Sequence, residues 1–542
     1  MSTLLQTPSD LAASWRLAAA LLLLPLAVVV VAQLLYLLSS RRRTNGAEDD
    51  HRRRSTGVPP PPGPPRQLPV LGNLLQVGSR PHRYFQALAR RYGPVVQVQL
   101  GRVRTLVVSS PDAAREVLRT NDLHCCSRPN SPGTYCPRLL SYDCRDVAFS
   151  PYSDYWREMR KLFIVELLSM RRVQSFAYAR AAEVDRLVSS LAAAGSPPGG
   201  GAAVDLSEML YALFDGIIGT VAFGKMYGSS QFERSSFQHV MDETLRVLGS
   251  FTFEDFFPAS GLARLADVLT GAAGRRRSVF RKIDRFFDLV IDKHLEPERL
   301  QAGVQEDMVD ALVKMWREQG DDNEGAHGFT RHHIKGILMD TFAGGIDTCA
   351  VTMIWIMSEL MRNPRVMRKA QAEVRSLVGN KPRVDEEDVK NLSYLKMVVK
   401  ENFRLHPPGT LLIPRETIRG CEIGGYDVLP GTRVFVNVWA MGRDPSIWEN
   451  PEEFMPERFE GSDVDFRGSN FELVPFGSGR RSCPAVAMAV ANLEFVLANL
   501  IHCFDWVLPQ GMKEEDIDME EIGQLVFRKM TPLCLVPIKH VV

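Results

Sequence analysis

The chain has 542 residues, 45% of them hydrophobic and 24% charged, with a formal net charge of +1. This composition is typical of a globular protein and excludes a disordered one, and the balanced charge gives no field that would attract nucleic acid. Nine cysteines, an odd number scattered along the chain, argue against a disulfide framework and favour a reducing compartment.

The first predicted element is the apolar run over 17–38, LAAALLLLPLAVVVVAQLLYLL. As a helix it would extend roughly 33 Å, enough to cross a hydrocarbon core of about 30 Å. A cleaved signal peptide is the alternative, but the length of the run and the arginines at 41–43 and 52–54 disfavour it. Basic residues on that side hold it in the cytoplasm. We therefore expect a membrane anchor over 1–40 and, over 41–68, a basic and proline-rich linker that is stiff and extended.

The remaining residues, 69–542, read as one body, mainly α with a small β portion. Apolar residues recur at helical spacing in most of it. The predicted helices cover 156–192, 205–223, 276–294, 331–362, 364–378, 394–405 and 484–502. The predicted strands are short and cover 94–99, 104–109, 421–428 and 432–436.

One cysteine stands in a sequence suited to a cofactor, FGSGRRSCPA at 476–485. Glycines let a backbone lie close to a flat ring, and Arg481 can pair with a carboxylate in a bidentate manner. Pro484 suits the first turn of a helix, so Cys483 is expected at a helix N-terminus, where the dipole favours the thiolate. The alternative is a structural cysteine in a glycine-rich turn.

This stretch resembles the haem-binding loop of the cytochrome P450 family, FxxGxRxCxG. Phe476, Gly479, Arg481 and Cys483 match, while Ala485 replaces the last glycine and adds a methyl group near the ring. The resemblance implies the P450 fold, preceded here by one N-terminal transmembrane helix. It also implies haem b (iron protoporphyrin IX) as cofactor, Cys483 as the iron ligand and Phe476 beside the ring.

Two further motifs fit the same family. ENFR at 401–404 matches ExxR, with Glu401 and Arg404 one turn apart on one helix face. PERF at 456–459 supplies Arg458. The resemblance implies that Glu401, Arg404 and Arg458 form a structural triad that holds the chain around the cysteine loop.

A third motif, FAGGIDTC at 342–349, resembles the oxygen-binding helix of the family. Two glycines inside a helix cost roughly 1 kcal/mol each relative to alanine, so something must need the space. Close helix packing is one reason and a groove for O₂ is the other. The resemblance implies the groove, with Thr348 holding a hydrogen bond there and Asp347 helping to relay protons.

Other matches concern the cofactor's carboxylates. Trp156 and Arg160 in WREMR, and Arg415 in PRE, match family positions that reach haem propionates. Together with Arg481 they would neutralise two carboxylates that are costly to bury. For Trp156 and Arg160 the alternative is an amphipathic helix with exposed arginines.

Several phrases, among them DGIIGTVAFG and GSNFELVPFG, resemble plant microsomal A-type members that act on aromatic aldoximes. This implies a monooxygenase that converts a small hydrophobic plant metabolite, an aromatic aldoxime, through the nitrile to a cyanohydrin. A terpenoid or phenylpropanoid hydroxylase and, in another class, a non-enzymatic haem-binding protein are the alternatives. By family position, the substrate pocket would contain the following residues: Phe342, Ala343, Gly344, Leu411, Leu412 and Leu525.

The sequence contains no flavin or NADPH motif, so the electrons must come from a partner. The resemblance implies NADPH–cytochrome P450 reductase, with cytochrome b5 as a second candidate. It also implies a single-pass protein of the endoplasmic reticulum membrane with a cytosolic catalytic domain. A basic surface for the reductase would consist of Arg157, Lys161, Arg171, Arg172 and Arg480.

Overall fold

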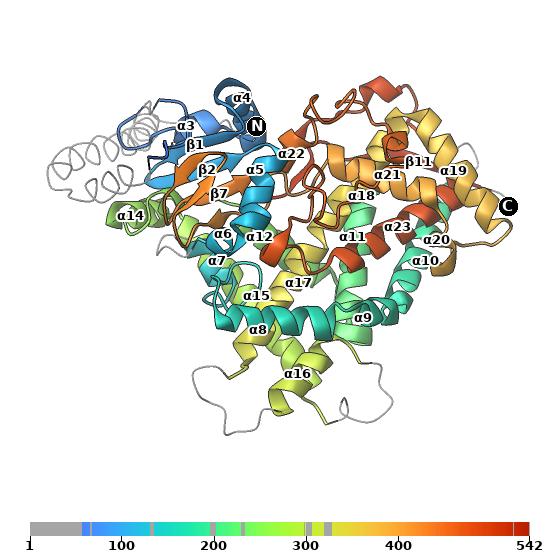
Figure 1. The fold of residues 1–542 in the computed structure, drawn as a ribbon. Helices are drawn as coiled ribbons and strands as arrows, with labels where there is room; N and C mark the ends of the chain where they lie inside the picture. The colour runs from blue at the N-terminus through green and yellow to red at the C-terminus, as the bar shows by residue number, and fades with distance from the viewer. Residues whose placement is uncertain are drawn as a thin grey trace, which may run out of the picture.

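The computed structural model describes residues 57–65, 68–129, 135–195, 202–228, 234–297, 299, 306–318, 328–523 and 525–540. The predicted anchor over 1–40 and the first part of the predicted linker lie outside these described residues. Helices make up most of the described chain, and a smaller part rich in strands lies at one side of them (Figure 1).

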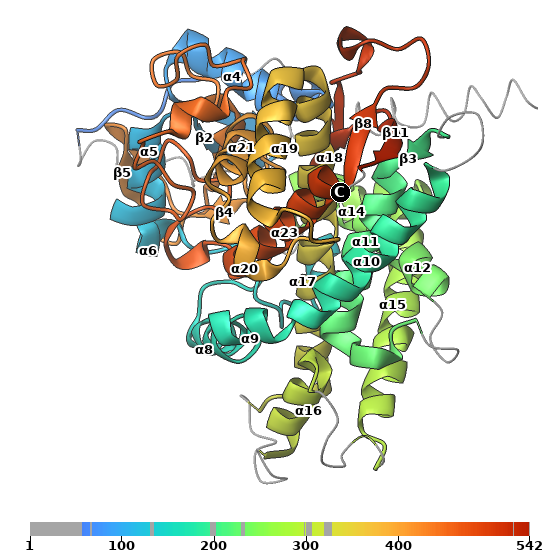
Figure 2. The ribbon, with the colours of Figure 1, turned by 90° about the vertical axis from the view of Figure 1, so that its right-hand side faces the viewer.

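The helical part is built around a long helix that is broken once. The longer helices are α4 (Pro81–Tyr92), α8 (Asp154–Leu162), α10 (Ala177–Ala194), α11 (Leu206–Phe223), α12 (Arg234–Leu248), α14 (Gly261–Leu269), α15 (Ala272–His294), α16 (Met308–Glu318), α17 (Arg331–Gly345), α18 (Asp347–Arg362), α19 (Pro364–Val378), α21 (Ser393–Leu405) and α23 (Val486–Cys503). Almost every residue of α18 is buried, because α11, α19, α21 and α23 all pack against it (Figure 2). A helix that is apolar on all faces needs such a covering.

Short helical segments connect these helices. They are α3 (Leu74–Val77), α5 (Pro111–Arg115), η2 (Glu116–Thr120), α6 (Asp122–Cys125), α7 (Tyr135–Leu140), η3 (Phe163–Leu167), α9 (Met170–Ser175), η4 (Gly224–Met226), α13 (Phe253–Phe256), α20 (Glu386–Val389), α22 (Val438–Met441), η6 (Pro456–Phe459), η7 (Gly479–Arg481) and η8 (Glu514–Asp516). The helix predicted over 156–192 is therefore three pieces, α8 with η3, α9 and α10. The structure breaks where Leu168 leaves the helical conformation at ψ 12°.

Three helices, α11, α17–α18 and α23, have the length and apolar composition to cross a membrane, and 67% of each apolar window is buried inside the fold. Most of the apolar side chains of these three helices pack in the core of the protein.

The main sheet has the strand order β1-β2-β7-β4. β1 (Val95–Leu100) and β2 (Val103–Val108) form a hairpin in which Val95 is opposite Val108, and β2 runs parallel to β7 (Arg433–Val436). β4 (Arg415–Glu416) closes the order. The predicted strand over 421–428 is a hairpin of β5 (Cys421–Ile423) and β6 (Tyr426–Val428), because two glycines with positive φ turn the chain between them.

Smaller sheets consist of β3 (Val204–Asp205), β11 (Cys534–Lys539) and β8 (Phe504–Val507), and of β9 (Glu521–Gly523) with β10 (Phe527–Lys529).

The described part of the proline-rich segment, 57–65, lies on the sheet. The amide of Gln97 donates to the carbonyl of Pro62 (2.8 Å), and that of Asp427 to Pro59 (2.9 Å). A Cβ on Gly63 would stand 1.9 Å from the carbonyl oxygen of Gln97, so only glycine allows this approach. We predicted a stiff, extended linker over 41–68, and its described part lies along the edge of β1, where proline costs no ladder bond.

Candidate active site

The cysteine loop lies between η7 and α23. The amide of Cys483 donates to the carbonyl of Phe476 (2.8 Å) and closes the loop. Gly479 has φ 71°, and a Cβ there would lie 2.2 Å from the carbonyl oxygen of Leu118. Glycine is therefore required at position 479 for two reasons, the left-handed backbone conformation and the close approach of η2.

The helix after the cysteine begins later than we predicted. α23 starts at Val486 with Ala485 as its N-cap, so Pro484 lies before the first turn and not within it. Burial raises the pKa of the Cys483 thiol, although the amide of Ala485 and the charge of Arg160 lower it. The helix end alone does not favour the thiolate, and a metal cation bound to the sulfur would supply the stronger effect.

The charged triad is present as the two motifs predict. Arg404 forms a bidentate pair with Glu401, with Nε–Oε2 and Nη2–Oε1 distances of 2.8 Å, and Arg458 Nε lies 3.0 Å from Glu401 Oε1. Arg404 and Glu401 are fully buried. The remaining N–H groups of Arg404 donate to backbone carbonyls, including those of Pro451 (2.7 Å) and Glu453 (3.0 Å). The triad thus fixes the irregular chain that leads to the cysteine loop.

Three of the expected cofactor arginines gather beside this loop. Arg481 donates to the carbonyls of Cys126 and Ser150 (both 2.7 Å). Arg415 pairs with Asp122 (2.8 Å) and donates to the Ser478 carbonyl (2.7 Å), and Arg160 donates to the Ser482 carbonyl (2.6 Å).

Trp156, which we expected to reach a haem propionate, contacts Val147 and Arg481 in the structure. Its indole N–H donates to the carbonyl of Val147 (3.0 Å), and its ring stacks under the guanidinium of Arg481 at 3.9 Å. Trp156 therefore orients Arg481 through a cation–π contact, and its own donor is already bonded within the protein.

Sequence reasoning missed a fourth arginine in this group. Arg128 is buried and donates to the carbonyls of Ala148 (2.8 Å) and Ile413 (2.7 Å). Burial and the charges of Arg481 and Arg415 lower its pKa well below the usual value. Burial first, and then the charges of Arg415 and Arg160, lower the pKa of Arg481 to about 9. No motif marks Arg128, because only the tertiary fold brings its segment to the loop.

The carboxylates in contact with this group are fewer than its cations. Asp122 pairs with Arg415. Asp340 accepts the amides of Val147 (2.7 Å) and Ala148 (3.1 Å), and burial raises its pKa to about 6. Burial and the nearby Asp340 raise the pKa of Asp146 well above its usual value, because burial and a neighbouring carboxylate both disfavour its charged form.

This charge balance tests whether the site suits haem. The four guanidiniums of Arg128, Arg160, Arg415 and Arg481 outnumber the carboxylates beside them, and Asp122 is shared between Arg415 (2.8 Å) and Arg480 (3.0 Å). Positive charge therefore remains at this place, which suits the two propionates that haem carries. The donor set and the charge therefore fit that cofactor.

The two glycines of the central helix have different surroundings. A Cβ on Gly345 would lie 2.7 Å from Ile218 Cδ1 of α11, whereas a Cβ on Gly344 would meet nothing within 4 Å. Gly344 is exposed although α17 crosses the middle of the molecule (Figure 1). Both explanations of the motif hold, one for each glycine: Gly345 allows helix packing, and Gly344 opens a space.

The helix breaks next to this space. α17 ends at Gly345, α18 begins at Asp347, and Ile346 lies between them with ψ −66°. The hydroxyl of Thr348 donates to the carbonyl of Gly344 (2.5 Å), so Thr348 lies at the edge of the space with its hydroxyl held by the helix. We expected one continuous helix over 331–362, and the structure interrupts it at Ile346.

Asp347 lies on the other side of the break. Its Oδ1 accepts the hydroxyl of Tyr211 (2.9 Å) on α11. Burial raises the pKa of Asp347, which the bond from Tyr211 and the charge of Arg528 oppose.

The predicted substrate-pocket residues are only partly brought together. Phe342 is fully buried among Phe223, Phe237 and Phe287. It therefore faces the aromatic core and not the space at Gly344, and its place in a substrate pocket stays a prediction. Ala343 and Leu525 are half-buried, Leu411 is nearly buried, and Leu412 is half-buried with φ 55°. A left-handed leucine is strained, and its Cδ1 lies 3.7 Å from where a Cβ on Gly477 would stand.

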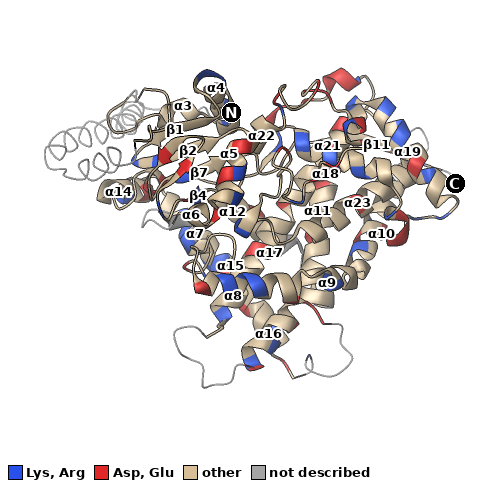
Figure 3. Cartoon of the chain, in the orientation of Figure 1, with Lys and Arg blue, Asp and Glu red and all other residues tan. Residues whose placement is uncertain are grey.

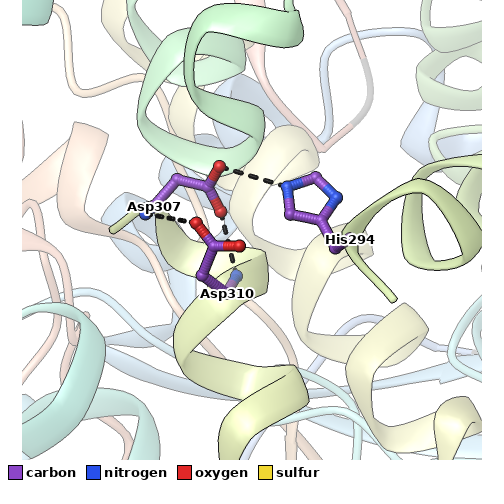
Figure 4. Close-up of side chains that lie close together, drawn as sticks. All are labelled: His294, Asp307 and Asp310. Atoms are coloured by element: carbon purple, nitrogen blue, oxygen red, sulfur yellow. Dashed lines mark hydrogen bonds and ion pairs between the residues drawn. The ribbon is translucent and has the colours of Figure 1, made fainter. Parts of the chain in front are cut away.

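A second polar cluster, His294, Asp307 and Asp310, lies where α15 meets α16 (Figure 4). His294 Nε2 is 3.1 Å from Asp307, and Arg299 pairs with Asp307 and, at 2.9 Å, with Asp310. Because Arg299 already provides the positive charge, this cluster is explained as an ion-pair network that joins the two helices.

Comparisons with known proteins agree with this geometry. A solved structure of a zebra fish cytochrome P450 with abiraterone superposes with a TM-score of 0.70 at 24% identity, covering 85% of this chain and all (100%) of that one, which shows the fold. The 4-hydroxyphenylacetaldehyde oxime monooxygenase of Sorghum bicolor is 55% identical over 478 residues, 88% of each chain.

Two other relatives are less similar. The 2-methylbutanal oxime monooxygenase of Manihot esculenta is 49% identical, over 88% of this chain and 90% of its own. Cytochrome P450 71B10 of Arabidopsis thaliana is 46% identical, over 88% of this chain and 93% of its own. The family model described as Cytochrome P450 matches residues 61–535, and the chain therefore belongs to the cytochrome P450 family, whose members bind haem and act as monooxygenases.

Proposed function

We propose that this cytochrome P450 monooxygenase converts an aromatic aldoxime to its nitrile and then hydroxylates the nitrile to a cyanohydrin. The observation that carries the proposal is the 55% identity, over 88% of both chains, to an enzyme named for 4-hydroxyphenylacetaldehyde oxime. A second relative, at 49% identity, is also named for an oxime. The open space at Gly344, beside half-buried Ala343, is consistent with a small guest.

The proposed roles of the residues follow from their places. Cys483 would ligate the haem iron, and Arg128, Arg160, Arg415 and Arg481 would hold the propionates. When bound, a haem with a thiolate ligand supplies the activation of O₂.

The proposed chemistry has two steps at one site. Loss of water from the aldoxime R–CH=N–OH gives the nitrile without net oxidation. The Thr348 hydroxyl lies at the edge of the Gly344 space and donates to the Gly344 carbonyl, and it would turn from this carbonyl to give a hydrogen bond to the leaving OH. The second step consumes O₂, NADPH and a proton to insert one oxygen next to the nitrile and release water. There Asp347, whose pKa is raised by burial, would return protons to the Thr348 side of the helix break.

Electrons and location form a second part of the proposal. Arg157 and Lys161 on α8, Arg171 on α9 and Arg480 beside the cysteine loop are exposed, and blue segments of the ribbon mark basic residues on α8 in Figure 3. This supports docking of the acidic reductase, or of cytochrome b5, at the cysteine side. Some of these charges are paired: Arg157 with Asp154, Arg480 with Asp122 (3.0 Å) and the less exposed Arg172 with Glu306 (2.8 Å).

Exposed apolar side chains support a membrane location. Leu265, Val268 and Leu269 of α14 are 52%, 56% and 60% exposed, and Leu75 of α3 is 72% exposed. The turn between β1 and β2 contacts the segment before α14, because the backbone amide of Arg102 donates to the carbonyl of Phe256 (2.8 Å). Such a cluster is unusual on a surface that meets only water, which supports attachment to the endoplasmic reticulum membrane at this end.

The test is to supply 4-hydroxyphenylacetaldehyde oxime to membranes that contain this protein, the reductase and NADPH. We expect loss of the oxime and formation of the nitrile, the cyanohydrin and the aldehyde into which it decomposes, measured by mass spectrometry, with none in a Cys483→Ser control. Turnover of a terpenoid or phenylpropanoid from the same panel, with the oxime unchanged, would refute the aldoxime assignment and favour a general hydroxylase.

A further inference from the structure

The carboxylate of Asp347 is held from the side of α11. Tyr211 donates its hydroxyl to Oδ1 at 2.9 Å. α11 reaches this position because Gly345, at the end of α17, lets Ile218 pack against the helix break. The hydrogen bond therefore depends on the close approach that one of the two glycines allows.

A positive charge lies beyond Tyr211, toward solvent. Arg528 on β10 is exposed, and its charge opposes the effect of burial on the pKa of both Tyr211 and Asp347. β10 is fixed to α18 because Trp355 donates its indole N–H to the carbonyl of Phe527 (3.2 Å). Asp242 on α12 faces the same arginine, so α11, α12, α18 and β10 all border this polar line.

We propose that Tyr211 is a positioning residue that connects Asp347 to solvent at Arg528 and returns protons to it during oxygen use. In this step the Tyr211 hydroxyl gives its proton to the Asp347 carboxylate while its oxygen takes one from a hydronium ion of the solvent beside Arg528, which leaves water, so Tyr211 stays neutral and the net change is one proton moved from solvent to Asp347. The inference rests on the proposed role of Asp347 and Thr348. Burial disfavours a tyrosinate, which requires the two transfers to occur together.

The first experiment needs no turnover. The infrared band of the protonated Asp347 carboxyl, identified as the band that Asp347→Asn removes, is titrated with pH in the ferric holoenzyme. Loss of the Tyr211 hydroxyl bond in Tyr211→Phe should move the midpoint of this band to higher pH, since the bond stabilises the carboxylate. Tyr227→Phe is the matched control, because Tyr227 also donates to an aspartate on α11, Asp215, and should leave the band unchanged. An unmoved midpoint in Tyr211→Phe would overturn the inference.

The second experiment measures coupling, with 4-hydroxyphenylacetonitrile as the probe because its hydroxylation isolates the oxygen-consuming step. Tyr211→Phe should form about tenfold less product per NADPH and release peroxide, less than the ~100- to 10,000-fold effect of a positioned acid or base because water can replace the hydroxyl. Adding Tyr211→Phe to an Asp347→Asn protein should cause no further loss of product per NADPH. Wild-type coupling in Tyr211→Phe, or faster product formation, would refute the link.

The two proposals fail in different ways. If wild-type protein forms no product from the nitrile, the proposed function fails, and the infrared titration still decides whether Tyr211 controls Asp347. If wild-type protein forms product and Tyr211→Phe couples equally well, only the present inference fails.

Discussion

The two adjacent glycines of the central helix offer a matched pair of substitutions. In Gly345→Ala the new Cβ would lie 2.7 Å from Ile218 Cδ1 and 3.0 Å from its Cγ1, whereas in Gly344→Ala it would meet nothing within 4 Å. Ile218 is 2% exposed and β-branched, so it cannot move away cheaply.

The free energies of unfolding of the two variants differ by the overpacking cost alone, because both variants gain the same helix propensity. Alanine gains about 1 kcal/mol of helix propensity over glycine in a helix, and overpacking costs about 1–3 kcal/mol. We therefore expect Gly344→Ala to be as stable as the wild type or more stable, and Gly345→Ala to be less stable than Gly344→Ala by about 1–3 kcal/mol. Gly344→Ala should nevertheless lose turnover, because its methyl group enters the open space.

The assay is urea unfolding followed by circular dichroism, with haem in excess and the slope m compared between variants to confirm that only stability changed. Product formation is measured on the same preparations. Equal stability of the two variants would refute the packing of α11 against the helix break, and full activity of Gly344→Ala would refute the assignment of the space.

Three further outcomes are expected. Thr348→Ala should retain haem while consuming NADPH without product, and Thr348→Ser should restore coupling; normal coupling in the alanine variant would exclude a proton role. Cys483→Ser should lose the reduced carbon monoxide band typical of a thiolate ligand, and a retained band would remove Cys483 as the ligand. His294→Gln should lower the free energy of unfolding by about 1–3 kcal/mol near pH 6 and by less at higher pH. The reason is that the pKa of His294 is raised above 6.5 in the fold by its bonds to Asp307 and Val290, so its contribution is complete below that value and is lost as pH rises through the folded pKa; a pH-independent difference would contradict this.

Local patterns predicted the parts of the site that depend on neighbours in sequence. Glu401 and Arg404 share a helix face because they are three residues apart, and Arg458 follows in a motif of fixed context. The glycine pair was different: the sequence suggested packing or a groove, and only the position of α11 shows that Gly345 serves the first and Gly344 the second.

The parts that escaped prediction depend on contacts between distant segments. Arg128 and the Asp146–Asp340 pair carry no motif, and they meet at the cysteine loop only through the tertiary fold. Phe342 was assigned to the pocket by position in its motif, but neighbouring residues on a helix point about 100° apart. Its ring consequently faces the aromatic core while Gly344 faces the space.

The surplus of buried positive charge beside Cys483 has a consequence for the life of the protein in the cell. Unpaired buried charge destabilises a fold, and a cofactor that binds only the folded state adds stability in proportion to the logarithm of its concentration. Newly made chains that lack haem would therefore be the ones that proteases remove. The steady amount of this enzyme would follow haem synthesis as well as transcription, and an excess of messenger RNA alone would not raise it.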